Sequence, residues 1–509
     1  MLALFLGFVL LVTCGLISTI QIAKSVREMN AYTASHQADY FPPYPVIAAS
    51  KKTALVKRGE YVIKSGDCLA CHTDTDHKGP LFGGGLAMPT PFGVLYTPNI
   101  TPDKKTGIGN WQYKDFKRAM RDGVNPHGQF YYPALPYPYF THMSDDELKA
   151  AWAYLRAIPA VHKDKVPDRM AFPFNFRVFQ LGWRILFFDF NKNGALADDK
   201  TKSKRWNRGR YIVRGPGHCE MCHSPSYYIL NKTFVLGAPI KKYDLTGQKI
   251  QGYLAPNITS TNLGDVPAER ITRVFTHDTM TTNAKVAGPM LEVNHDSLKY
   301  LTQEDLLSIA TYLKSVKSQI PPVPKSGIPG KGLYESTCSG CHETGSGGAP
   351  KYGDATDWDP YIKKGMKTMD YNALHGFKGM PAKGTCSTCS VKDIEDAVAY
   401  MANSVKGKKA GPAPKPQAKP LTMADGQHIY AHHCAACHNP GRAGAPRIGN
   451  KAAWAPIVKA GLPLAFERTM HGYKGHPAMG GCTQCSGEEI KAALKYMMQR
   501  SSNKNFSLW

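Results

Sequence analysis

Acidic residues are scarce in this chain, and the signatures of common enzyme classes are missing. The 509 residues include 39 Asp and Glu against 63 Lys and Arg, which gives a formal net charge of +24. The sequence has no glycine-rich nucleotide loop, Ser/His/Asp arrangement, pair of catalytic carboxylates or nucleic-acid motif. It therefore predicts no substrate pocket and no nucleic-acid partner. The positive charge favours steering toward acidic protein partners, with a generally solvated basic surface as the alternative.

Long apolar runs are also scarce, and the one over 2–22 is long enough to cross a bilayer. A cleaved signal peptide is the rival interpretation, but no charged segment precedes the run and no small-residue cleavage site follows it. We expect an uncleaved transmembrane anchor over 1–23, with Cys14 alone inside it, followed by a linker over 24–52.

Four copies of Cys-x-x-Cys-His organise the rest of the chain. Cysteines at this spacing can each take a haem vinyl group as a thioether, and the adjacent histidine is then the proximal iron ligand. Zinc sites and redox disulfides also use Cys-x-x-Cys, but chance does not place a histidine after all four pairs. The sequence thus predicts four covalently attached haem c groups. Their thiols are Cys68, Cys71, Cys219, Cys222, Cys338, Cys341, Cys434 and Cys437, and their histidines are His72, His223, His342 and His438.

Helical patterns flank each motif, so the predicted fold is all-α, with four tandem cytochrome c domains behind the N-terminal transmembrane helix. In the closing helix of the first domain, Leu148, Trp152 and Leu155 recur at helical spacing and should pack on the opening helix. The third and fourth copies are related without a gap, for example from Trp358 to Trp454 (454 − 358 = 96). The expected boundaries are 53–160 for the first domain, 161–203 for an inter-domain segment, 204–320 for the second domain, 327–404 for the third, 405–420 for a Pro/Lys-rich tether and 421–503 for the fourth.

The sixth ligand of a c-type haem is usually Met or His. Met290 in the second unit and Met380 in the third lie in the loop before the last helix, where this ligand is expected. In the fourth unit the repeat aligns His476 with Met380 (476 − 380 = 96), and Met479 lies three residues later. We expect His476 to bind, which would give a bis-histidine haem, and Met479 is the alternative.

The first unit has Leu135 at the expected distal position, and leucine cannot bind iron. Met88, His127, His142 and Met143 are the candidates for its sixth ligand. A substitute from the same loop, His142 or Met143, is favoured over an open iron.

With these motifs, the first half of the chain resembles the cytochrome c subunits of membrane-bound alcohol and gluconate dehydrogenases. The resemblance is carried by 85–93 (GLAMPTPFG), 98–103 (PNITPD), 107–111 (GIGNW), 132–138 (YPALPYP) and 288–290 (GPM). That family normally carries Met where Leu135 stands, so the resemblance supplies no ligand for the first haem.

The second half resembles two tandem cytochrome c-5 domains, a family in which a Cys-x-x-Cys disulfide follows the axial methionine. The resemblance implies disulfides between Cys386 and Cys389 and between Cys482 and Cys485. A Cys₄ zinc site is the alternative, but it would require two separately tethered domains to converge.

Haem attachment in bacteria takes place outside the cytoplasmic membrane, so the expected location is the periplasmic side of the bacterial inner membrane. The sequence predicts a membrane-anchored tetrahaem c-type cytochrome that relays single electrons between a membrane or periplasmic donor complex and a terminal haem–copper oxidase. One alternative is the cytochrome c subunit of a periplasmic alcohol or sugar dehydrogenase that passes electrons to quinone. A second alternative is a small-molecule redox enzyme at an open first haem.

Overall fold

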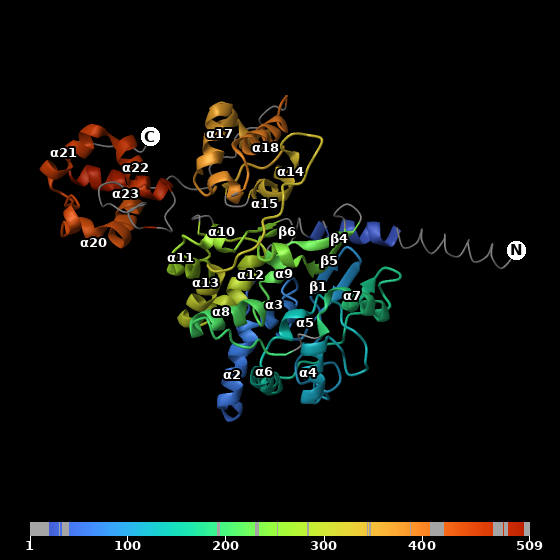
Figure 1. Ribbon diagram of the computed structural model, residues 1–509. Helices are drawn as coiled ribbons and strands as arrows, with labels where there is room; N and C mark the ends of the chain where they lie inside the picture. The colour runs from blue at the N-terminus through green and yellow to red at the C-terminus, as the bar shows by residue number, and fades with distance from the viewer. Residues whose placement is uncertain are drawn as a thin grey trace. The chain divides into compact units, whose positions relative to one another are not determined.

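The computed structural model describes residues 20–29, 31–32, 40–190, 194–229, 234–251, 253–281, 285–343, 345, 348–386, 388–407, 422–471, 482 and 487–502 (Figure 1). The chain divides into two compact units, Met1–Ala410 and Gly411–Trp509, and each is described by itself. The described backbone is mostly helical. The described residues form four clusters of buried apolar side chains, three in the larger part of the chain and one in the smaller. The segments that surround these four clusters are called the first to fourth units.

The first core lies between two helices that come from its two ends. α2 (Ala54–Ser65) packs against α6 (Asp145–Ala157), and Leu148 and Leu155 are buried while Trp152 packs against the same core, as predicted. The elements between these helices are α3 (Cys68–His72), β1 (Ala87–Thr90), β2 (Gly93–Tyr96), α4 (Tyr113–Asp122) and α5 (Tyr137–Phe140). Flanking them are η1 (Ala49–Lys51), β3 (Arg169–Met170), η2 (Arg177–Phe179) and α7 (Gln180–Phe187).

The second core repeats this plan with α8 (Lys204–Arg214) packed against α13 (Gln303–Leu313). The elements between are α9 (Glu220–His223), β4 (Ser226–Ile229), β5 (Phe234–Pro239), η4 (Lys241–Tyr243), β6 (Gln248–Ile250), β7 (Tyr253–Ala255), α10 (Ser260–Leu263), α11 (Ala268–Thr276), α12 (Pro289–Asp296) and η5 (Leu298–Tyr300).

The third and fourth cores are copies of a second type. Trp358 and Trp454 are both buried, and each donates its indole N–H to a carbonyl oxygen seven residues earlier, at 2.8 and 2.9 Å. The third unit contains α14 (Lys331–Leu333), η6 (Tyr334–Cys338), α15 (Ser339–His342), α16 (Ala355–Ile362), α17 (Met366–His375), η8 (Ala382–Thr385) and α18 (Val391–Asn403). The fourth contains α19 (Met423–Ile429), η9 (Tyr430–Cys434), α20 (Ala435–His438), η10 (Arg442–Gly444), α21 (Lys451–Ala460), α22 (Leu462–His471) and α23 (Gly487–Arg500).

A glycine at the start of each unit lets its last helix approach at backbone distance. A Cβ atom built on any of the four would lie far inside the contact distance of a carbonyl oxygen on the last helix, so no other residue fits without moving a helix. The pairs are Gly59 with Ala150 (1.9 Å), Gly209 with Ser308 (1.8 Å), Gly330 with Asp396 (2.0 Å) and Gly426 with Ala492 (2.4 Å).

Side-chain caps fix where the closing helices begin. Ser144, Thr302 and Ser390 each accept a hydrogen bond from the backbone N–H three residues later. Acidic residues occupy the first turns of these helices, where the helix dipole favours negative charge.

The all-α prediction is confirmed in its main part but missed three small antiparallel sheets. Their strand orders are β1-β2-β3, β4-β5 and β6-β7. These strands span two to six residues; β3 follows the closing helix α6, and the others lie in the loops between a haem motif and its closing helix. They are held by backbone pairing between loop segments, which leaves little trace in hydrophobic periodicity.

Within the described part of the chain, no helix is long and apolar enough to cross a membrane. The expected anchor over 1–23, including Cys14, lies mostly outside the described residues, and so does most of the expected tether over 405–420.

Candidate haem-attachment sites

Each Cys-x-x-Cys-His histidine hydrogen-bonds through Nδ1 to the carbonyl oxygen of a proline. The pairs are His72–Pro98 (2.8 Å), His223–Pro256 (2.8 Å), His342–Pro350 (2.9 Å) and His438–Pro446 (2.9 Å). An N–H donated from Nδ1 fixes the ring orientation and leaves the lone pair of Nε2 for a metal. All four sites therefore hold their histidine as an iron ligand must be held.

Sequence reasoning did not identify these prolines, although a signal was present. Pro98 and Pro256 open the repeated Pro-Asn-Ile-Thr, and Pro350 and Pro446 follow alanine at the 96-residue offset (446 − 350 = 96). The carbonyl, and not the ring, makes the contact, so the role cannot be read from side-chain chemistry.

Burial keeps three of the histidines neutral. It lowers the pKa of His72, His223 and His342, and the hydrogen bond to proline only partly offsets this effect. A neutral imidazole is the form that binds iron.

The motif cysteines do not pair with one another in the structure. Burial raises the pKa of Cys68 and Cys219 to about 12 and that of Cys222 to about 11. A thioether carries no charge, so attachment of these thiols to haem is compatible with their burial. No group of three or more His, Cys, Asp or Glu that could hold a metal ion occurs among the described residues.

The first two motifs lie close to each other. α3, which carries the first motif, contacts α12 of the second unit, and His218, just before the second motif, meets the ring of Phe140 at 5.7 Å. Burial raises the pKa of Cys71, and the neighbouring Asp67 and Cys222 raise it further. Thiols of both motifs are therefore within electrostatic reach of each other.

An ionic network joins the same two units. Glu147 on α6 pairs with Arg58 (2.5 Å) and Arg208 (3.4 Å), and Arg208 also pairs with Asp305 on α13 (2.7 Å). Tyr61 donates its hydroxyl hydrogen to Asp305 at 2.5 Å, and Tyr211 makes the matching bond to Glu147. Burial favours a neutral Asp305, but the hydrogen bonds from Arg208 and Tyr61 outweigh it and hold its pKa below the usual value. Ion pairs and hydrogen bonds thus join the opening and closing helices of the first and second units.

Met290 and Met380, the predicted sixth ligands, pack against the cores of their units, and one cysteine of each motif, Cys219 and Cys338, packs against the same core. Met290 follows Gly288, whose φ of 61° suits glycine and where a Cβ would lie 2.5 Å from the Tyr253 ring. Met380 exchanges two backbone hydrogen bonds of 2.9 Å with Phe377, which closes a tight turn.

The candidates for the sixth ligand of the first haem differ in their burial and in their place relative to the first core. Leu135 packs against the first core together with Cys68, and Met143, 2% exposed, belongs to that core. His127 is exposed, and the half-buried His142 directs Nδ1 to the Gly194 oxygen at 3.5 Å. Met88 lies on β1, half-buried and outside the core cluster.

The alternatives at the fourth site, His476 and Met479, lie outside the described residues, and so does Cys485. The choice between these two ligands stays a prediction. Cys482 is described and is 2% exposed.

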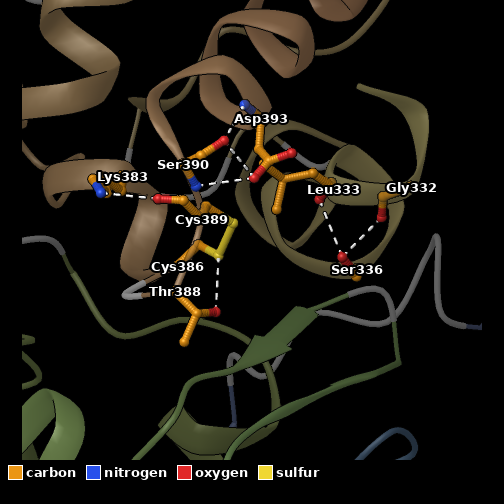
Figure 2. Close-up of a disulfide and its surroundings, with 9 residues drawn as sticks. All are labelled: Gly332, Leu333, Ser336, Lys383, Cys386, Thr388, Cys389, Ser390 and Asp393. Atoms are coloured by element: carbon orange, nitrogen blue, oxygen red, sulfur yellow. Dashed lines mark hydrogen bonds between the residues drawn. A yellow bond between two sulfur atoms is a disulfide. The ribbon is translucent and has the colours of Figure 1, made fainter. Parts of the chain in front are cut away.

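Figure 2 shows Cys386 bonded to Cys389 immediately before α18. Lys383 donates from Nζ to the Cys389 carbonyl oxygen at 2.9 Å, and Ser390 caps the helix. The two sulfurs are bonded to each other, so this pair is not arranged as a zinc ligand set.

Comparison with known proteins gives dehydrogenase cytochrome subunits over most of the chain and an oxidase-subunit family model over its C-terminal part. The gluconate 2-dehydrogenase cytochrome c subunit of Pantoea cypripedii is 33% identical over 385 residues, which cover 70% of this chain and 85% of that protein. The cytochrome c subunit of alcohol dehydrogenase (quinone) from Gluconacetobacter polyoxogenes is 31% identical over 395 residues, 70% of this chain and 82% of that protein. A subunit of nicotinate dehydrogenase from Pseudomonas putida is 34% identical over 325 residues, 61% of this chain but only 26% of that longer protein. The family model described as cytochrome c oxidase, cbb3-type, subunit III matches twice, at 327–401 and 421–497.

Proposed function

Because the chain belongs to the family of cytochrome c subunits of gluconate and quinone-linked alcohol dehydrogenases, we propose that it is a four-haem c-type cytochrome that relays single electrons. Covalent haem c is common to these relatives. The count of four rests on one observation, the repeated arrangement of two unpaired thiols beside a histidine held by a proline carbonyl.

In this proposal the eight motif cysteines form the thioethers, and His72, His223, His342 and His438 are the proximal ligands. Met290 and Met380 complete the second and third irons, and His476 completes the fourth. For the first iron we propose Met143, because it shares a core with Cys68 and Leu135 whereas the other candidates lie outside that core. The bound haems supply reversible one-electron chemistry. The chain orients the four histidines through the proline carbonyls.

The partners follow from the two kinds of relatives. The first half, similar to dehydrogenase cytochrome subunits, would receive electrons from a dehydrogenase partner, and the second half, which matches an oxidase subunit model, would deliver them to a terminal haem–copper oxidase. Delivery to quinone is the alternative. The proposed setting is the periplasmic face of the bacterial inner membrane, with 1–23 as the anchor and the net charge of +24 favouring acidic partners.

Counting and titrating the haems tests the relay. Mass spectrometry of the intact protein should show four haem additions, and redox titration with EPR and near-infrared MCD should show four low-spin irons. Methionine ligation raises the reduction potential. Met290→His should therefore lower one potential, whereas Met366→His, a control at a 40% exposed position on α17, should lower none.

The first haem decides between a relay and an enzyme. Met143→Leu should convert one low-spin iron into a high-spin iron that binds carbon monoxide, and adding Leu135→Met should restore the low-spin state. A wild-type protein that already binds carbon monoxide at one high-spin iron would instead favour the small-molecule enzyme. Copper and flavin analysis of the affinity-purified complex identifies the partner: copper indicates the oxidase, and flavin or a quinone cofactor indicates a dehydrogenase.

A further inference from the structure

The β6–β7 hairpin is bonded to the second haem motif on one side. The backbone N–H of Gly247 donates to the His223 oxygen at 2.6 Å, and Gln248 Nε2 donates to the Met221 oxygen at 3.0 Å. On the paired strand, Pro256 follows Ala255, the partner of Gln248, and its carbonyl accepts the bond from His223 Nδ1. Both strands of the hairpin are therefore attached by hydrogen bonds to the second motif.

The third haem motif packs against the same hairpin. Gly340, inside Cys-x-x-Cys-His, lies against Leu254 on β7: a Cβ on Gly340 would be 2.0 Å from the Leu254 Cβ and 2.9 Å from its Cα. Gly340 is buried although Cys341 beside it is exposed. Lys249 on β6 forms an ion pair with Glu343, two residues after Cys341.

The tandem repeat shows that the motif itself does not need this glycine. Ala436 stands at the matching position of the fourth motif (436 − 340 = 96), and it is exposed. Glycine at 340 is therefore explained by the contact with Leu254, and the packed face is the haem-binding turn itself.

We infer that the β6–β7 hairpin is the contact through which one electron passes between the second and third haems, an inference that rests on the proposed function. The chain atoms run from His223 across its bond to Pro256, along Ala255 and Leu254, and across the packed contact to Gly340 beside Cys341. With haem bound at both motifs, the donor site would be oxidised by one electron and the acceptor site reduced by the same electron. No proton and no ligand is exchanged.

The test uses the full-length protein with Met290→His, because replacing Met lowers the potential of the second haem and separates its spectrum from that of the third. After photochemical reduction, the rate of electron arrival at the third haem is followed. Gly340→Ala, which installs the residue of the fourth motif, should slow this rate about tenfold or more, the factor that corresponds to about 1.4 kcal/mol of lost docking free energy. Gly182→Ala, at a glycine on α7 where a Cβ would meet nothing within 4 Å, should leave it unchanged.

Charge reversal provides a second measurement that leaves the motif intact. Lys249→Glu should slow the transfer, and Lys249→Glu with Glu343→Lys should restore it. An unchanged rate in both Gly340→Ala and Lys249→Glu, with four haems still attached, overturns the inference and leaves the relay standing. Loss of haem at Cys338 and Cys341 in the unmutated protein would refute the proposed function itself.

Discussion

Gly209→Ala tests the helix crossing on which each haem unit is built. Gly209 lies inside α8, and the added Cβ would stand 1.8 Å from the Ser308 oxygen and 2.4 Å from its carbonyl carbon. Real Cβ contacts essentially never fall below 3.0 Å, so the two helices must separate by at least 1.2 Å (3.0 − 1.8 = 1.2). The neighbour is backbone, and no side-chain rotation can make room.

The magnitude follows from two opposing effects. Alanine favours a helix over glycine by ~1 kcal/mol. Overpacking costs about 1–3 kcal/mol in ordinary cores, and a backbone clash of this depth belongs at the top of that range or above it. We expect a net loss of about 2 kcal/mol or more, which lowers the melting temperature of a unit of this size by ~10 °C.

Gly182→Ala is the matched control. Gly182 also lies inside a helix, α7, but a Cβ there would meet nothing within 4 Å. Only the helix preference then acts, so the melting temperature should stay the same or rise slightly. The assay is calorimetric unfolding of the holoprotein, with the transition of the second unit followed by haem absorbance. Equal melting temperatures for the two variants would refute the crossing argument.

Three further outcomes are expected. Replacing both Cys386 and Cys389 by serine should destabilise the third unit, because the disulfide restricts the unfolded chain. The expected loss is only about 2 kcal/mol, since the closed loop is very short. An unchanged thermal midpoint of that unit would contradict this. Glu147→Gln should lower the free energy of unfolding in urea by about 1–3 kcal/mol, because Arg208 loses a buried partner while the more exposed Arg58 is rehydrated. Glu304→Gln, which breaks the exposed pair with Arg205, should have a smaller effect than Glu147→Gln, and an equal effect would contradict this account. Burial, and to a smaller extent Glu292, raise the pKa of Asp296 to about 7. The folded protein therefore keeps a proton on Asp296 that the unfolded chain releases near pH 4. As a result, the free energy of unfolding should fall as the pH rises from about 4 to 7 and then level off. Asp296→Asn should remove that part of the pH dependence, and an unchanged unfolding profile would show that Asp296 is ionised when folded.

The sequence by itself predicts the chemistry of this protein from patterns that are local in the chain. A pair of cysteines followed by histidine on one helical turn specifies haem attachment locally, so four motifs predict four sites whatever surrounds them. The 96-residue offset and the helical spacing of Leu148 and Leu155 are also local patterns, and the structure reproduces both. Met290 and Met380 also precede a closing helix along the chain, and their role as sixth ligands stays a prediction.

Tertiary structure decided everything that depends on segments distant in sequence. The carbonyl groups that accept hydrogen bonds from His72 and His223 lie in loops that return to them 26 and 33 residues later in the sequence. Every residue has a backbone carbonyl, so residue type alone does not identify the acceptor. Leu135 looked like a missing ligand in sequence, and only the packed core brought Met143 to the same cluster as Cys68. Likewise, the sequence gives no reason for a glycine at position 340 between the two cysteines, and the reason is the contact with Leu254 in the folded protein. Close packing joins residues by surface shape, and shape is a property of the folded chain.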